Sequence, residues 1–139
     1  SRSPLVWIRG TMNAQRYIEE VVNAHLLPYL ETLENPIFQQ DNARPHVARV
    51  TLQHLQHSGV EILPWPARSP DLSPIEHVWD MIGRRVTNLP RPPGTLDELW
   101  HQVQVAWDNL PQDNINQLLR SMPRRVRECV QHRGGGTHY

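Results

Sequence analysis

The sequence predicts an α/β domain in which short strands alternate with helices and some strands pair in parallel. Short apolar runs bounded by Gly, Pro or Asn alternate with longer segments of helical periodicity along the first two thirds of the chain. The last third shows helical periodicity only. A chain of 139 residues fits one domain with a single core. Alternation of this kind favours a layered α/β architecture followed by a helical segment.

Three short segments have the composition of strands. Residues 4–8, PLVWI, are apolar and precede Gly10. Residues 36–40, PIFQQ, lead directly into Asp41. Residues 60–63, VEIL, form the third predicted strand.

Two helices are predicted between these strands. Residues 14–33 carry apolar side chains at steps of three and four, and Pro28 is expected to kink or interrupt that helix. The next helix begins near Pro45, which suits a first helical turn, and ends at Gly59.

A proline-rich loop, residues 64–74, separates these elements from the helical part of the chain. Ser73 begins one predicted helix, and Thr95, with Glu98 three residues later, caps the next. Two shorter helices are predicted from Pro111 and from Ser121. The final residues, 132–139, have the composition of a mobile tail.

Composition restricts the classes of partner. The formal net charge is zero, so any contact with nucleic acid must come from local patches. All 14 basic residues are arginine, which favours bidentate pairing with phosphate or carboxylate, although biased codon usage explains the bias equally well. The lone Cys129 excludes a disulfide framework and a cysteine-based zinc finger. No apolar run approaches the roughly 20 residues of a membrane span, so no membrane partner is expected.

Asp41 follows the predicted strand 36–40. Ligands of open α/β sheets gather beyond the carboxyl ends of strands, so this carboxylate is well placed for chemistry. A turn in which the Asp41 side chain accepts backbone N–H groups is the alternative interpretation, and on local grounds the stronger one.

Glu76 also has two interpretations. Ser73, Pro74 and Glu76 match a capping box, with Ser73 as N-cap, Pro74 at the first helical position and Glu76 reaching back to the cap amide. A capping role needs no further function to explain the residue, and a metal ligand is the competing hypothesis.

Considered together, the two carboxylates favour the metal-ligand hypothesis. They are separated by 34 residues (76 − 41 − 1), and each lies in a distinctive motif. The motifs are QQDNARPH around Asp41 and PARSPDLSPIEHVWD around Glu76. Both motifs and their separation resemble the catalytic domain of mariner-superfamily transposases, in which three carboxylates on a ribonuclease H-like fold bind divalent metal. The resemblance extends over nearly the whole chain, including the VWIRG segment and the arginine pair after Glu76.

The resemblance implies a three-layer ribonuclease H-like fold of the retroviral integrase type, with Asp41 and Glu76 as the second and third metal ligands. It implies Mg²⁺ or Mn²⁺ as cofactor, since carboxylate oxygens suit hard cations and two ions can activate the attacking oxygen and stabilise the leaving one. It further implies cut-and-paste transposition, with DNA as partner, a homodimer of the full-length protein and a nuclear location.

One departure from the family pattern concerns the first carboxylate. No aspartate precedes Asp41, so the resemblance implies a domain that is incomplete at its N-terminus and a two-metal site that lacks one ligand. We expect residues 1–90 to form the later part of the catalytic domain and residues 91–139 to form its C-terminal helices and tail. We also expect the isolated chain not to cleave DNA efficiently. The alternative is a catalytically inactive transposase-derived DNA-binding or interaction remnant.

Several residues are candidates for DNA contacts, each with a structural alternative. Histidine and arginine side chains near the motifs are suited to phosphate, and a tryptophan between prolines is suited to stacking on a base. A solvated helix face explains the arginines about equally well, and packing beneath the loop is the default for the tryptophan. The candidates are His46, Trp65, Arg68, Arg84, Arg85, Arg124 and Arg125. His54 and His57 lie at i, i+3, but without a third ligand they give only weak support to a zinc hydrolase.

Overall fold

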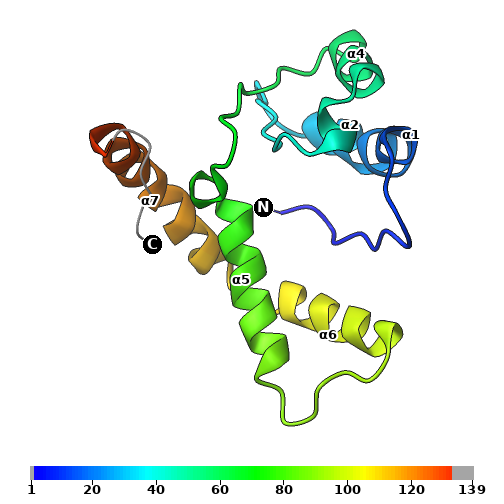
Figure 1. The fold of residues 1–139 in the computed structure, drawn as a ribbon, viewed down its shortest axis with the longest axis vertical. Coiled ribbons are helices and arrows are strands. Elements are labelled where there is room, and N and C mark those ends of the chain that lie inside the picture. Colours follow the sequence, from blue (N-terminus) through cyan, green and yellow to red (C-terminus); the bar gives the residue numbers. More distant parts are fainter. Residues whose placement is uncertain (1, 133–139) are drawn as a thin grey trace. The chain divides into compact units, whose positions relative to one another are not determined.

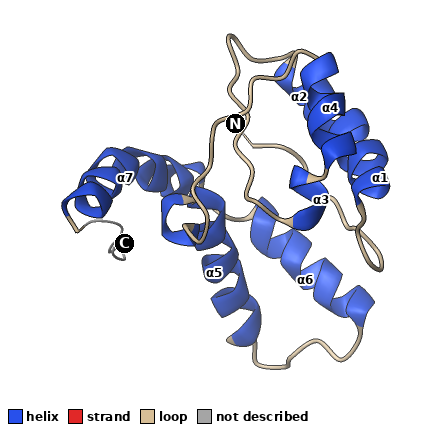
Figure 2. Cartoon of the chain, turned by 45° about the horizontal axis from the view of Figure 1, so that its top comes forward, coloured by secondary structure: helices blue, strands red, loops and turns tan. Residues whose placement is uncertain are grey.

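The computed structural model describes residues 2–132, and these divide into two compact units. One unit comprises residues 2–67, and the other begins at Arg68. Within the described part of the chain no helix combines the length and apolarity needed to cross a membrane. Figures 1 and 2 show helices joined by loops.

The first unit contains two helical segments. The first segment runs without a break through α1 (Ala14–Arg16), a π-helix (Tyr17–Leu26) and α2 (Leu27–Leu30). The second comprises α3 (Arg44–Val47) and α4 (Arg49–His57), which are separated by the extended backbone of Ala48.

The predicted interruption at Pro28 takes the form of a change in helix type. The N–H of Leu27 donates to the carbonyl of Val22, five residues earlier, and the chain then continues as α2 with Pro28 in its first turn. Proline lacks an N–H and is tolerated in a first turn, so the helix continues past Pro28. The predicted end at Gly59 is confirmed: Ser58 is the C-cap of α4, and Gly59 has a φ of 72°.

The predicted strands are confirmed only in part. Residues 36–40 and 60–63 meet at one isolated parallel bridge between Phe38 and Ile62, where the Phe38 N–H donates to Glu61 and the Leu63 N–H donates to Phe38, each at 2.8 Å. The strand predicted at 4–8 is wrong for the described chain, which is non-regular there (Figure 2). A strand exists through hydrogen bonds to a neighbour, and apolar composition alone does not supply one.

The core of the first unit lies between the π-helix and α4. Tyr17, Val22 and Leu55 are buried there, with Val22 and Leu55 fully enclosed. Partly buried side chains from the bridge, including Phe38 and Ile62, pack against this cluster. Thus the bridge that precedes Asp41 rests directly on the core.

The second unit is helical. A 3₁₀ turn, η2 (Pro70–Leu72), precedes α5 (Pro74–Thr87), and α6 (Leu96–Asp108) and α7 (Gln112–Gln131) follow. Both α6 and α7 pack against α5. The rings of Trp79 and Trp107 stack with centroids 5.8 Å apart. The buried apolar residues of this unit are Val78, Ile82, Ala106, Trp107, Leu110 and Leu118.

The C-terminal helices differ from the prediction. Two short helices were expected from Pro111 and Ser121, but one helix, α7, spans Gln112–Gln131 with Pro123 inside it. Proline removes one backbone hydrogen bond, but the helix continues past Pro123, with Leu118 and Arg125 buried on either side of it. The predicted mobile tail lies outside the described residues, apart from His132.

Candidate active site

Asp41 lies in an ordered turn directly after the bridged segment. Its Oδ1 accepts the N–H of Ala43 at 2.9 Å, so the predicted side-chain turn is present. The same oxygen lies 2.6 Å from Nδ1 of His46, in the first turn of the following helix. The Asp41 side chain is still 57% exposed, which leaves room for a ligand at its carboxylate.

A buried polar network supports the Asp41–His46 pair. The hydroxyl of Tyr17 donates to Oε1 of the buried Gln40 at 2.9 Å, and Nε2 of Gln40 donates to the carbonyl of His46 at 3.2 Å. The rings of Tyr17 and His46 lie with their centroids 4.5 Å apart. The main chain and ring of His46 are therefore both held from the core side, and with them the partner of Asp41.

These contacts determine the charge of Asp41. The hydrogen bond from Ala43, followed by the hydrogen bond and charge of His46, lowers the pKa of Asp41, and these effects outweigh the opposing effect of burial. An ionised carboxylate only accepts hydrogen bonds, so Nδ1 of His46 is the donor. Burial, and then the charge of Asp41, raise the pKa of Tyr17 to about 12, so this hydroxyl remains protonated and continues to donate at neutral pH.

Glu76 lies in the first turn of α5, where the positive end of the helix dipole favours a carboxylate. The predicted capping box is wrong in its side-chain bonds. Ser73 is the N-cap and Pro74 opens the helix, but the Ser73 side chain makes no cap bond, and the contact to the N–H of Glu76 comes from the Ser73 carbonyl at 3.2 Å. Ser73 is buried.

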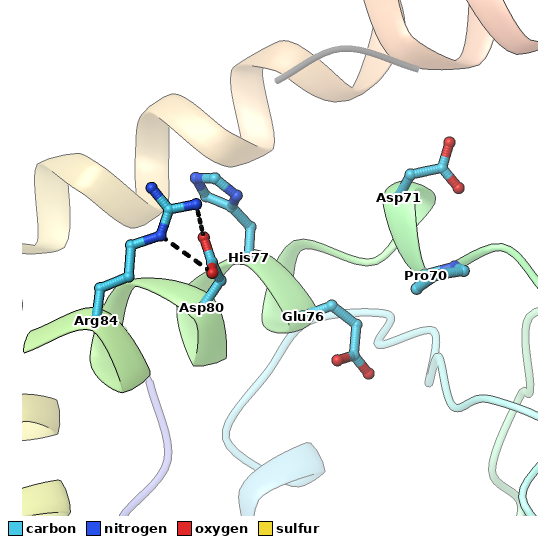
Figure 3. Close-up of a pocket in the computed structure, with 6 residues that line it drawn as sticks. All are labelled: Pro70, Asp71, Glu76, His77, Asp80 and Arg84. Carbon is cyan, nitrogen blue, oxygen red and sulfur yellow. Dashed lines mark hydrogen bonds and ion pairs between the residues drawn. The ribbon is translucent and has the colours of Figure 1, made fainter. Parts of the chain in front are cut away.

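The carboxylate of Glu76 is exposed, and within residues 2–132 no hydrogen bond or ion pair engages it. Together with Pro70, Asp71, His77, Asp80 and Arg84 it lines an open pocket of about 440 Å³. Figure 3 shows Glu76 pointing away from the Asp80–Arg84 ion pair, whose closest atoms are 2.8 Å apart. Glu76 is therefore available to a ligand that approaches from solvent.

The donor chemistry of both residues fits a divalent cation such as Mg²⁺ or Mn²⁺. Each supplies carboxylate oxygens, which hard cations prefer. Asp41 is ionised and ordered, and Glu76 is exposed without a competing partner. Within the described range, no three His, Cys, Asp or Glu side chains gather as a metal-binding group. Asp41 belongs to the first unit and Glu76 to the second, so each is described in its own surroundings.

The residues predicted to contact DNA differ in how exposed their side chains are. Arg68, Arg84, Arg85 and Arg124 are exposed, and Arg84 and Arg124 form ion pairs with Asp80 and Glu128. Trp65 is half-buried, and its carbonyl accepts a hydrogen bond from Asn42. His46 pairs with Asp41, as above. These assignments remain predictions.

The structure contradicts the prediction that Arg125 contacts DNA. Its side chain is fully buried, and the guanidinium donates to groups inside the protein, including the carbonyl of Asp71. A buried guanidinium that is already bonded has no surface to offer a phosphate, so the prediction of Arg125 as a DNA contact is wrong. The arginine-rich pattern did not distinguish it from its exposed neighbour Arg124, because burial depends on the packing of α7.

Sequence reasoning missed Tyr17 and Gln40 as supporting residues. Tyr17 belongs to the apolar stripe of the first helix, and Gln40 lies one residue before Asp41, so neither stands out by type. The available signal was the position of Gln40 itself. In a strand, side chains alternate between faces, so the neighbour of an outward carboxylate points to the core.

Comparisons with known proteins found a matching family model and similar sequences. A family model described as DDE superfamily endonuclease matches residues 1–109. The Tcb1 transposase of Caenorhabditis briggsae is 32% identical over 141 residues, which cover 100% of this chain and 50% of the relative. The Tc1 transposase of Caenorhabditis elegans is 33% identical over 143 residues, with the same coverage. The chain therefore spans about half the length of these relatives.

The fold is similar to that of a solved transposase domain. The crystal structure of the catalytic domain of Mos1 mariner transposase matches with a TM-score of 0.80 and 24% identity, covering 94% of this chain and 66% of that one. Other Mos1 structures are described with Mn, with Mg and with the left transposon end. At this identity the likeness shows a shared fold.

Proposed function

Because the chain belongs to the DDE superfamily endonucleases, we propose that it forms part of the catalytic domain of a Tc1/mariner-type transposase and supplies two of its metal ligands, Asp41 and Glu76. The observation that carries the proposal is Asp41 itself. Its carboxylate is ionised, oriented by Ala43 and His46, and still more than half exposed at the end of the bridged segment. An Asx turn alone would not require a buried network behind it.

Metal binding is the chemical role of the two carboxylates. Mg²⁺ or Mn²⁺ would supply charge stabilisation and activation of an oxygen nucleophile at a phosphodiester. Asp41 would contribute an oxygen from its rigid turn, and His46 would keep that oxygen oriented by donating from Nδ1. Glu76 would contribute an oxygen from the first turn of α5. The Mos1 structures described with Mn and Mg support this choice of metal.

The partner under this proposal is DNA. Phosphodiester hydrolysis at element ends, followed by strand transfer into target DNA, is the activity we propose for the whole protein, acting as a homodimer in the nucleus. Exposed arginines at 68, 84, 85 and 124 are the candidate phosphate contacts, and Trp65 is the candidate for stacking. The Mos1 complex with the left transposon end supports a DNA partner.

The architecture under this proposal is a three-layer ribonuclease H-like fold. The parallel bridge between Phe38 and Ile62 would be part of a central sheet. The first predicted unit, residues 1–90, and the C-terminal helices, residues 91–139, would belong to one catalytic domain.

Metal binding tests the proposal directly. Mn²⁺ affinity of the 139-residue chain would be measured by the loss of the electron paramagnetic resonance signal of the free ion. We expect Asp41→Asn and Glu76→Gln each to weaken binding by about tenfold or more, since loss of even an outer-shell partner costs that much. Glu34→Gln, which removes another exposed carboxylate, should leave the affinity unchanged.

The opposite result has a defined meaning. If neither Asp41→Asn nor Glu76→Gln weakens Mn²⁺ binding, the metal-ligand assignment is wrong. The interpretation as a catalytically inactive transposase-derived remnant would then be preferred.

A further inference from the structure

Arg125 is a fully buried charged side chain in the second unit, and the proposed metal site does not use it directly. It lies in α7, and its Nη1 donates to the main-chain carbonyl of Asp71 at 2.5 Å, across 54 residues of sequence. Asp71 belongs to the 3₁₀ turn η2, which immediately precedes α5. A buried cation is thus bonded to the segment that leads into the Glu76 helix.

The guanidinium is held in a fixed orientation by α7 itself. Its Nε and Nη2 donate to the hydroxyl oxygen of Ser121 at 3.0 and 2.9 Å, and Nη2 also contacts the carbonyl of Leu118 at 3.4 Å. The Ser121 hydroxyl in turn donates to the Leu118 carbonyl at 2.7 Å. The planar fork of arginine makes all these bonds at once, which a lysine ammonium does not reproduce.

Backbone hydrogen bonds connect the turn that contains Asp71 to the first turn of α5, where Glu76 lies. Within η2 the N–H groups of Leu72 and Ser73 donate to the carbonyls of Ser69 and Pro70 at 3.2 and 3.0 Å. The N–H of Glu76 then donates to the carbonyl of Ser73 at 3.2 Å. Because the Ser73 side chain makes no cap bond, the start of α5 depends on this turn for its position.

We propose that Arg125 is a positioning residue for Glu76: it fixes the turn that opens α5 and thereby the place of the Glu76 carboxylate. The inference rests on the proposed role of Glu76 as a metal ligand. Under this proposal α7 contributes to the site through Arg125, although none of the proposed metal ligands lies in α7. It also explains why one arginine of the C-terminal run is buried while its neighbour is exposed.

Hydrogen exchange of backbone amides is the first test, because it needs no metal. The reporters are the amides of Leu72, Ser73 and Glu76 in the full 139-residue chain at mildly acidic pH. We expect Arg125→Lys to accelerate exchange at these three amides by about tenfold, since lysine cannot keep the whole set of bonds. The amides of Leu99 and Asn109, in α6 and at its C-cap, should be unchanged.

Two further variants separate local positioning from general destabilisation. Ser121→Ala removes the hydroxyl that accepts from Nε and Nη2, so it should produce a smaller acceleration at the same amides. Arg127→Lys is the matched control, because Arg127 is an exposed arginine of the same helix and has no assigned role in the site. It should change none of the reporters. If Arg125→Lys does not fold, Ser121→Ala decides the outcome.

Mn²⁺ affinity is the second test, and it distinguishes this inference from the proposed function. We expect Arg125→Lys and Ser121→Ala to weaken binding in the same order in which they accelerate exchange, and Arg127→Lys to leave the affinity unchanged. Unchanged exchange at Leu72, Ser73 and Glu76 in both variants would overturn the inference. So would unchanged affinity in these variants while Glu76→Gln weakens binding. If Glu76→Gln itself has no effect, the proposed function fails, and the role of Arg125 toward the metal site fails with it.

Discussion

Asp41 and Glu76 are held in opposite ways. Asp41 is oriented through its side chain, by the Ala43 N–H and by His46, with Tyr17 and Gln40 behind them. The Glu76 carboxylate has no such partner in the described chain, and its place depends on the backbone at the start of α5.

The difference shows that the position of a carboxylate can be fixed in two ways, by side-chain bonds or by the backbone. Side-chain bonds fix the carboxylate of Asp41 and lower its pKa, but they also occupy one of its oxygens. Backbone support fixes only the helix start and leaves both oxygens of Glu76 open to a ligand. Different substitutions disrupt these two kinds of contact. Loss of a side-chain hydrogen bond should affect Asp41, and loss of a backbone contact at the start of α5 should affect Glu76.

The largest effect is expected on the Asp41 side, from Tyr17→Phe. This change removes the donor to Gln40 and leaves a buried acceptor unsatisfied, so the free energy of unfolding should fall by about 1.5 kcal/mol. Urea unfolding at neutral pH measures this loss. Ser58→Ala, which removes an exposed hydroxyl in the same unit, is the control and should cost less than half as much.

The same variant should change the alkaline pH dependence. The pKa of Tyr17 is raised from roughly 10 to about 12, so the folded state holds this proton more tightly than the unfolded state does. The resulting stability is fully present below pH 10 and is lost as the pH rises toward 12. Tyr17→Phe should flatten this part of the stability profile. An unchanged profile would show that another group causes the alkaline loss.

A smaller effect should separate the two helix starts of the second unit. Thr95 caps α6 with its side chain, accepting the Glu98 N–H at 3.1 Å, so Thr95→Ala should cost about 1 kcal/mol. Ser73 makes no such bond at α5, and Ser73→Ala should cost less than half as much. Thermal unfolding of both variants makes the comparison. Equal losses would show that α5 depends on its cap side chain after all.

Another small effect on stability is expected from His46→Ala. The pair with Asp41 is partly exposed, so its loss should cost about 0.5 kcal/mol at neutral pH. The pKa of Asp41 should rise part of the way toward its ordinary value, because Ala43 still donates. A ¹³C titration of the Asp41 carboxyl measures the rise. An unmoved pKa would show that Ala43 alone determines it.

The acid side of this pH dependence follows from the lowered pKa of Asp41. The ionised form is favoured in the folded state, so its contribution is present above the ordinary aspartate pKa and is lost as the pH falls through the lower folded value. In His46→Ala this contribution should be smaller, and its loss should be complete at a higher pH.

Local patterns predicted many of the helices. The starts of α5 and α6, and the end of α4 at Gly59, follow from proline, threonine and glycine positions that act within one helical turn. The predictions failed where neighbours decide the outcome. Residues 4–8 are apolar enough for a strand but form none in the described chain, and Pro123 did not divide α7, which packs against α5.

The same distinction between local patterns and contacts of distant segments applies to the site. The motifs around Asp41 and Glu76, and their separation by 34 residues (76 − 41 − 1), singled out both carboxylates from sequence alone. The turn at Asp41 was likewise expected from residue type. The contact of Tyr17 with Gln40, 23 residues apart, and that of Arg125 with Asp71, 54 residues apart, were not.

The sequence by itself determined the family and several helix ends, and it singled out the two carboxylates as candidates, because caps, turns and motifs act over a few residues. Only the tertiary structure decided which arginine is buried, which side chains support Asp41, and that the Ser73 hydroxyl makes no cap bond. Burial and long-range hydrogen bonds arise when distant segments pack, and no local pattern records which segments will meet. Arg124 and Arg125 are alike in sequence, and the packing of α7 alone assigns one to solvent and the other to the turn before Glu76.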